Sequence, residues 1–132
     1  MNLKSSCICL AVFSLGIISC TKTVTVQPTY SVEGLWIGTY VANNSIAPPS
    51  YFSFVIQPGG KMIVQTVVTG TDTAYGSGGW SLVGDSLKCS YTYLFPVIFQ
   101  SATGIYNGSD TLSSGKWMDA FNTGTFQLKR VQ

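Results

Sequence analysis

The sequence predicts an all-β domain that folds as an antiparallel, eight-stranded up-and-down barrel. Eight runs of strand-forming residues follow one another with short connections, as in a meander that can close and remove its edges. Only 9% of the residues are charged, and Gly, Thr, Ser and aromatic residues are frequent, which is typical of all-β domains outside the cytoplasm. An open β-sandwich is the alternative, but its crossing connections need a long loop, for which residues 43–50 are the one candidate.

Each predicted strand ends at a turn signal. Pro48-Pro49 prevents regular pairing, and Gly84-Asp85 and Asn107-Gly108 are dipeptides that favour two-residue hairpin turns. No window of useful length has a helical period. The predicted strands are 33–42, 51–57, 61–69, 74–83, 86–95, 97–106, 110–118 and 123–131.

A recurring Gly-x-aromatic pattern supports closure into a barrel. A glycine on the inner face leaves room for a bulky neighbour, and small barrels alternate small and large inward residues. The pattern occurs at Gly34-x-Trp36, Gly78-x-Trp80, Gly115-x-Trp117 and Gly124-x-Phe126. The residues expected inside, which are bulky enough to fill a barrel of this size, are Trp36, Tyr40, Phe52, Phe54, Trp80, Tyr91 and Phe126.

The N-terminus has the pattern of an export signal. Lys4 precedes an apolar run over 7–18, which is too short to span a membrane and fits the h-region of a signal peptide. The run ends in "IISC", which resembles a bacterial lipobox with Cys20 as the acceptor. The resemblance implies cleavage after a signal peptide of residues 1–19, lipidation of Cys20, and membrane anchoring in the bacterial cell envelope, expected at the outer membrane. The alternative is an ordinary signal peptide in which Cys20 is incidental.

The domain prediction follows from this reading. Residues 20–32 are expected to form a lipidated tether, and residues 33–132 the barrel domain. Cys7 and Cys9 would be removed with the signal peptide, and Cys20 would carry the lipid. Cys89 would then be the one free cysteine, so no internal disulfide is expected. Cys89 alternates with Leu87 and Tyr91, as a buried apolar residue would.

The first predicted strand opens with Gly34-Leu35-Trp36, which resembles the G-x-W motif of lipocalins and their calycin relatives. In those families a basic residue near the end of the last strand often packs over the tryptophan. The resemblance implies a pair between Trp36 and Arg130, since the two strands are neighbours in a closed barrel. The other lipocalin signatures are absent and the chain is short, so the whole domain looks more like small lipoproteins with lipocalin-like or avidin-like barrels, and no ligand contacts carry over.

The sequence offers no catalytic apparatus, and we expect a protein that is not an enzyme. The chain contains no histidine, so a thiol or hydroxyl nucleophile would lack its usual base. Four of the five carboxylates, Asp72, Asp85, Asp110 and Asp119, fall in predicted turns or directly beside one, and metal-ligand spacings are missing. We therefore expect no metal and no cofactor. Seven basic against five acidic residues form no basic stripe, so nucleic acid is not an expected partner.

Two functional hypotheses remain open. The first is a binding module for a small apolar or glycan-like ligand, because tyrosine combines an apolar face with a polar tip. Its candidate contacts are Tyr40, Tyr51, Tyr91, Tyr93 and Tyr106. The second is interaction with a protein, including inhibition of an attacking enzyme. Here "SATGIY" (101–106) resembles the Ser/Gly/Tyr loop motif of membrane-bound lysozyme inhibitors, although those usually carry disulfides. A structural envelope role is the remaining option.

Overall fold

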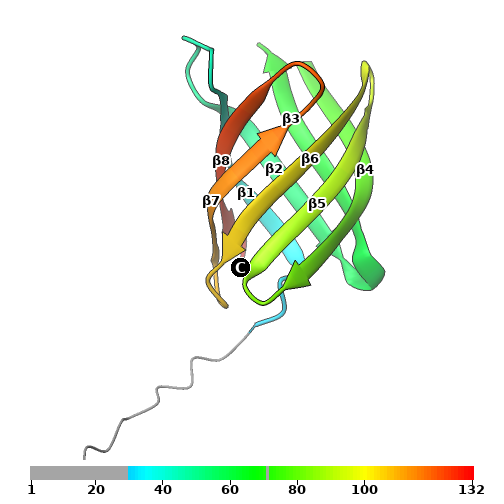
Figure 1. The fold of residues 1–132 in the computed structure, drawn as a ribbon, viewed down its shortest axis with the longest axis vertical. Helices are drawn as coiled ribbons and strands as arrows, with labels where there is room; N and C mark the ends of the chain where they lie inside the picture. The colour runs from blue at the N-terminus through cyan, green and yellow to red at the C-terminus, as the bar shows by residue number, and fades with distance from the viewer. Residues whose placement is uncertain (1–29, 71) are drawn as a thin grey trace, which may run out of the picture.

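The protein is a closed eight-stranded antiparallel barrel, as predicted (Figure 1). The computed structural model describes residues 30–70 and 72–132. Each strand is hydrogen-bonded to the strands before and after it, and β1 pairs with β8 to close the sheet, which excludes the open sandwich. The strands are β1 (Gly34–Ala42), β2 (Ser50–Gln57), β3 (Lys61–Thr69), β4 (Asp72–Val83), β5 (Ser86–Leu94), β6 (Val97–Tyr106), β7 (Thr111–Met118) and β8 (Thr123–Arg130).

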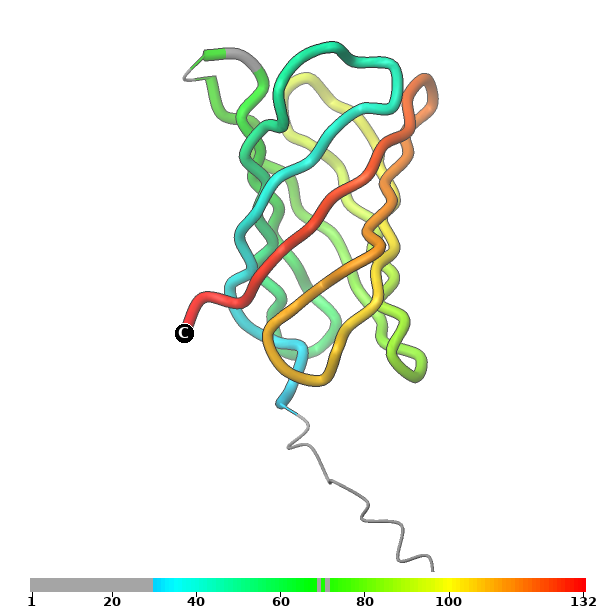
Figure 2. The backbone as a smooth tube through the Cα atoms, turned by 90° about the vertical axis from the view of Figure 1, so that its left-hand side faces the viewer, coloured from blue at the N-terminus to red at the C-terminus, as the bar shows by residue number. Residues whose placement is uncertain are grey.

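The up-and-down order gives the barrel two distinct ends (Figure 2). We call one end the base: it contains the short 3-10 turn η1 (Pro58–Gly60), the turns at 84–85 and 107–110, and residues 30–33. We call the other end the mouth: it contains the loops at 43–49, 95–96 and 119–122. The first described residues and the C-terminus both lie toward the base.

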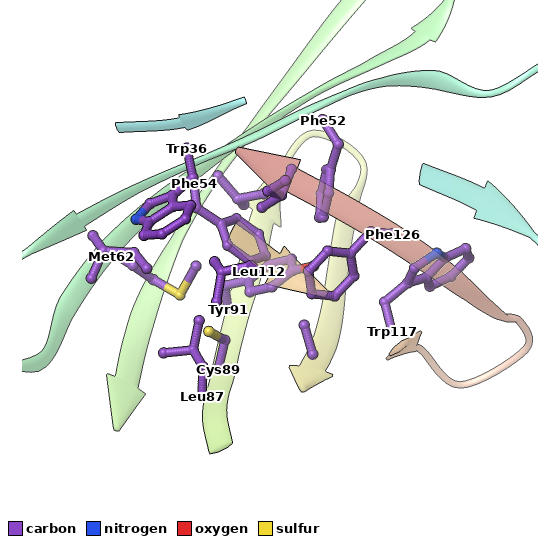
Figure 3. Packing of buried hydrophobic residues seen from close by; sticks show 14 of the residues in the cluster. Trp36, Phe52, Phe54, Met62, Leu87, Cys89, Tyr91, Leu112, Trp117 and Phe126 are labelled. Carbon is purple, nitrogen blue, oxygen red and sulfur yellow. The ribbon is translucent and has the colours of Figure 1, made fainter. Parts of the chain in front are cut away.

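Alternation along the strands places a continuous aromatic core inside the barrel. The rings of Phe52, Phe54 and Phe126 contact one another with centroids 4.8–5.5 Å apart. Such tilted and edge-on contacts add to the apolar burial. Figure 3 shows Trp36 and Trp117 on opposite sides of these packed rings.

In the Gly-x-aromatic pattern of β7 and β8, each glycine lies opposite an aromatic residue of the neighbouring strand. In the β7–β8 register, Gly115 faces Phe126 and Trp117 faces Gly124. A Cβ at Gly124 would stand 2.0 Å from the Val41 carbonyl oxygen and 2.5 Å from the Trp117 indole nitrogen. Each glycine therefore makes room for an aromatic ring on the neighbouring strand.

The predicted strands are confirmed to within two residues at each end. Two details differ. Residues 30–32, assigned to the tether, pack against the base, where Val32 is buried. The "SATGIY" segment is part of β6 and not of a loop, with Ala102, Gly104 and Tyr106 directed inward, so the resemblance to the inhibitor loop does not extend to its structural context. Among the residues that the structure describes, no helix is long and apolar enough to cross a membrane.

Candidate functional site

Trp36 and Arg130 meet at the base. The two residues are directly opposite in the β1–β8 register, and the guanidinium carbon of Arg130 lies 5.0 Å from the centroid of the Trp36 ring. This is cation–π distance. The Trp36 side chain is fully buried, and its indole N–H donates to the Val32 carbonyl at 2.8 Å.

The chain before β1 completes the closure of the base. The Tyr106 hydroxyl donates to the Tyr30 carbonyl at 2.6 Å, and Arg130 donates to the Ser31 carbonyl. The Tyr30 backbone N–H donates to Gly108 at 3.1 Å. The Tyr106 ring contacts Trp36 edge-on, with centroids 5.7 Å apart. These contacts plug the base of the barrel.

A small cavity of about 140 Å³ opens at the mouth. Four aromatic side chains from four different strands line it, and the rest of its wall is mostly aliphatic. Tyr40 contacts Phe52 and Trp117, with ring centroids 5.3 and 5.8 Å apart. The lining residues are Tyr40, Phe52, Thr66, Val68, Ala74, Tyr93, Pro96, Ile98, Gln100 and Trp117.

Two polar side chains at the cavity, Gln100 and Thr66, are held in place by hydrogen bonds to other residues, whereas the indole nitrogen of Trp117 is buried without a partner. The Gln100 side-chain oxygen accepts from the Tyr91 hydroxyl, and its amide donates to Asp119 Oδ2, both at 3.2 Å. The Thr66 hydroxyl donates to the Tyr51 carbonyl at 3.1 Å. Burial, with the neighbouring phenol groups adding to it, raises the pKa values of Tyr91 and Tyr93. Both phenols therefore stay protonated at neutral pH.

The five candidate tyrosines do not form one site. Tyr40 and Tyr93 line the cavity, and Tyr91 contacts Tyr93 edge-on, with centroids 5.7 Å apart. Tyr51 does not line it, because it is out of phase with the inward Phe52 and Phe54 on β2. Tyr106 belongs to the base plug.

Sequence reasoning missed Gln100 and Trp117 as candidate site residues. Both could have been found from alternation: Gln100 is in phase with Ala102 and Tyr106 on β6, and Trp117 follows Gly115 in the recurring pattern. Cys20, the residue expected to be lipidated, and the expected signal peptide lie outside the described residues.

The remaining chemistry-bearing groups have local roles. Burial raises the pKa of the Cys89 thiol to about 12, so it is not a nucleophile at neutral pH. Asp110 accepts from Asn107 and Thr111, and Asp119 accepts from the backbone N–H groups of Phe121 and Asn122. Over 30–70 and 72–132, no group of three or more His, Cys, Asp or Glu could hold a metal ion.

Next to the cavity, the mouth carries an exposed apolar patch. Phe95 and Phe121 are 86% and 94% exposed at the tips of their loops. An open groove of about 490 Å³ lies between the start of β6 and the β7–β8 loop and shares Ile98 with the cavity. The other exposed members of the patch are Leu94, Val97, Phe99 and Met118.

These features define the class of the protein as an up-and-down β-barrel, consistent with a lipocalin-like fold, with a plugged base and an aromatic cavity at its mouth. No protein-family model matches the chain, and no curated protein sequence matches it significantly.

Proposed function

We propose that the protein is a non-enzymatic lipoprotein of the bacterial cell envelope that binds a small, mainly apolar group in the cavity at its mouth. The observation that carries the proposal is the aromatic cavity itself: Tyr40, Phe52, Tyr93 and Trp117 surround a space of about 140 Å³. A dry cavity of about 150 Å³ is known to bind benzene in an engineered protein core. The space therefore fits a ring or a compact branched group, and larger ligands would extend out of the mouth.

The chemistry of the lining favours an apolar ligand over a glycan-like one. Thr66 and Gln100 already use hydrogen-bonding groups on protein partners, and most other lining residues are apolar. A sugar buried here would leave hydroxyl groups unpaired, which costs about 1–3 kcal/mol each.

The experiment is a titration of the protein with benzyl alcohol and, separately, with glucose, followed by two-dimensional NMR. Benzyl alcohol is expected to shift the signals of Tyr40, Tyr93 and Trp117, and glucose is not. Ala74→Leu, which adds bulk to the cavity wall, should abolish the shifts, and Ala47→Leu in the exposed 43–49 loop should leave them unchanged. Shifts that are absent, or that persist unchanged in Ala74→Leu, would refute binding in the cavity.

Interaction with a protein is the second candidate function, and the exposed apolar patch favours it. Large exposed apolar surfaces often mark protein interfaces. Native mass spectrometry of the protein purified from its own envelope separates the two candidates: a small molecule that co-purifies supports the first, and a stoichiometric protein supports the second. Recovery of the protein with neither bound would favour a structural envelope role.

A further inference from the structure

Four aromatic side chains in the cavity wall are arranged as in an aromatic cage. Its four aromatic side chains come from β1, β2, β5 and β7, so they approach the space from separate parts of the barrel. Their planes are inclined to one another, at 50° for Tyr40 and Phe52 and 73° for Tyr40 and Trp117. Aromatic rings carry negative charge on their faces, and cages of this kind recognise quaternary ammonium groups.

The charges around the cavity favour a cation over an anion. No basic side chain lines it. One acidic side chain contacts the lining: the Asp119 carboxylate accepts from Gln100 at 3.2 Å. Partial burial opposes ionisation of Asp119, but hydrogen bonds from Phe121, Asn122 and Gln100 together lower the pKa of this carboxyl, which is therefore negative at neutral pH. Lys116 alternates with the inward Gly115 and Trp117, so it lies on the outer face of β7.

From this juxtaposition we propose that the group bound in the cavity is a compact methylated cation of the trimethylammonium class. Such a group presents methyl surface to the apolar wall and its charge to the ring faces. The inference rests on the proposed function, because it names the ligand class of the same cavity. The cation can belong to a free small molecule or to a lipid headgroup, and both sources offer the same chemistry.

The test compares choline with its uncharged isostere 3,3-dimethyl-1-butanol, which has the same branched shape without the charge. Both are titrated into the full chain at low ionic strength and followed by NMR or calorimetry. We expect choline to bind at least fivefold more tightly. Equal or tighter binding of the alcohol would overturn the cationic class while leaving an apolar binding site intact. Binding of neither would refute the proposed function as well.

Three variants locate the effect. Trp117→Leu should bring the affinity ratio of choline to the alcohol close to one. Trp80→Leu, at the base and bonded to the Gln57 carbonyl, is the matched control and should keep the ratio of the unmodified protein. Asp119→Asn should weaken choline about twofold to fivefold and leave the alcohol unchanged. Binding of the alcohol also shows that each variant is folded. A ratio unaffected by Trp117→Leu would overturn the cage.

A final arm separates the two sources of the cation. The full chain carrying Cys20→Ser, which cannot receive the proposed lipid anchor, is sedimented with vesicles of phosphatidylcholine and, separately, of phosphatidylglycerol. Preferential sedimentation with phosphatidylcholine that is competed by free choline supports a lipid headgroup, with the exposed Phe95 and Phe121 at the membrane surface. Binding of choline without such sedimentation supports a free small molecule. Equal sedimentation with both lipids that choline does not compete would contradict recognition of the headgroup by the cavity.

Discussion

Arg130 lies over the ring of Trp36 at the seam where the last strand closes onto the first. Because Trp36 is fully buried and Arg130 also donates to Ser31, the pair fastens the two ends of the domain together. In a double-mutant cycle of Trp36→Leu and Arg130→Met, we expect a coupling free energy of about 0.5–2 kcal/mol. Denaturant unfolding of the four proteins measures it.

Lys129→Met provides the control for this cycle. Lys129 is the neighbour of Arg130 on β8 but lies on the exposed outer face. Combined with Trp36→Leu, it should be additive within about 0.5 kcal/mol. If the Arg130 cycle is equally additive, the contact does not stabilise the fold.

Gly124 is required because its neighbours occupy the position of a Cβ. In Gly124→Ala, the new methyl would collide with the Val41 carbonyl and the Trp117 indole. We expect a loss of about 1–3 kcal/mol in the free energy of unfolding. Gly104→Ala is the control, since a Cβ there meets its nearest atom at an ordinary 3.5 Å. Equal losses in the two variants would contradict a specific steric role for Gly124.

Cys89 should be unreactive while the barrel is folded. Its pKa of about 12 leaves roughly one thiolate in ten thousand at pH 8, and the side chain is buried. Treatment with iodoacetamide at pH 8, followed by peptide mass mapping, should leave the Cys89 peptide unmodified in buffer and fully modified in denaturant. Rapid modification in buffer would show that this part of the barrel opens.

Asp119 should make stability depend on pH. Its hydrogen bonds lower its pKa in the folded state, so its stabilising effect is present above the ordinary carboxyl pKa near 3.9 and is lost as the pH falls through the depressed folded-state value. Thermal unfolding measured from pH 7 to pH 2 should show a smaller loss of stability in Asp119→Asn than in the unmodified protein. Asp85→Asn, in the turn at the base, serves as the comparison. If the dependence of stability on pH is identical in all three proteins, the ionised Asp119 carboxylate does not stabilise the fold.

The fold could be predicted because it depends on local signals. Strand alternation and turn dipeptides such as Asn107-Gly108 set the strand limits, and closure follows when short connections join an even number of strands. The same alternation correctly directs Phe52, Phe54 and Tyr91 inward.

The site was harder to predict because it depends on register between distant strands. Tyr106 and Tyr40 are both inward tyrosines, but Tyr106 ends a strand that runs toward the base and Tyr40 lies on one that runs toward the mouth. Tyr51 is one residue out of phase with the inward Phe52 on β2, so it does not line the cavity. The plug formed by Tyr30 and Ser31 has no periodic signal, since its hydrogen bonds are made by backbone carbonyls.

That plug also determines where mechanical load enters the domain. Tyr30 and Ser31 are held by Tyr106, Gly108 and Arg130, which belong to β6, the β6–β7 turn and β8. Tension applied to the chain before Tyr30 would therefore act first on the C-terminal half of the barrel and only afterwards on β1. Force from the N-terminal side is therefore resisted first by hydrogen bonds to three other segments of the barrel. The hydrogen bonds between β1 and its neighbouring strands bear the force only after these bonds break.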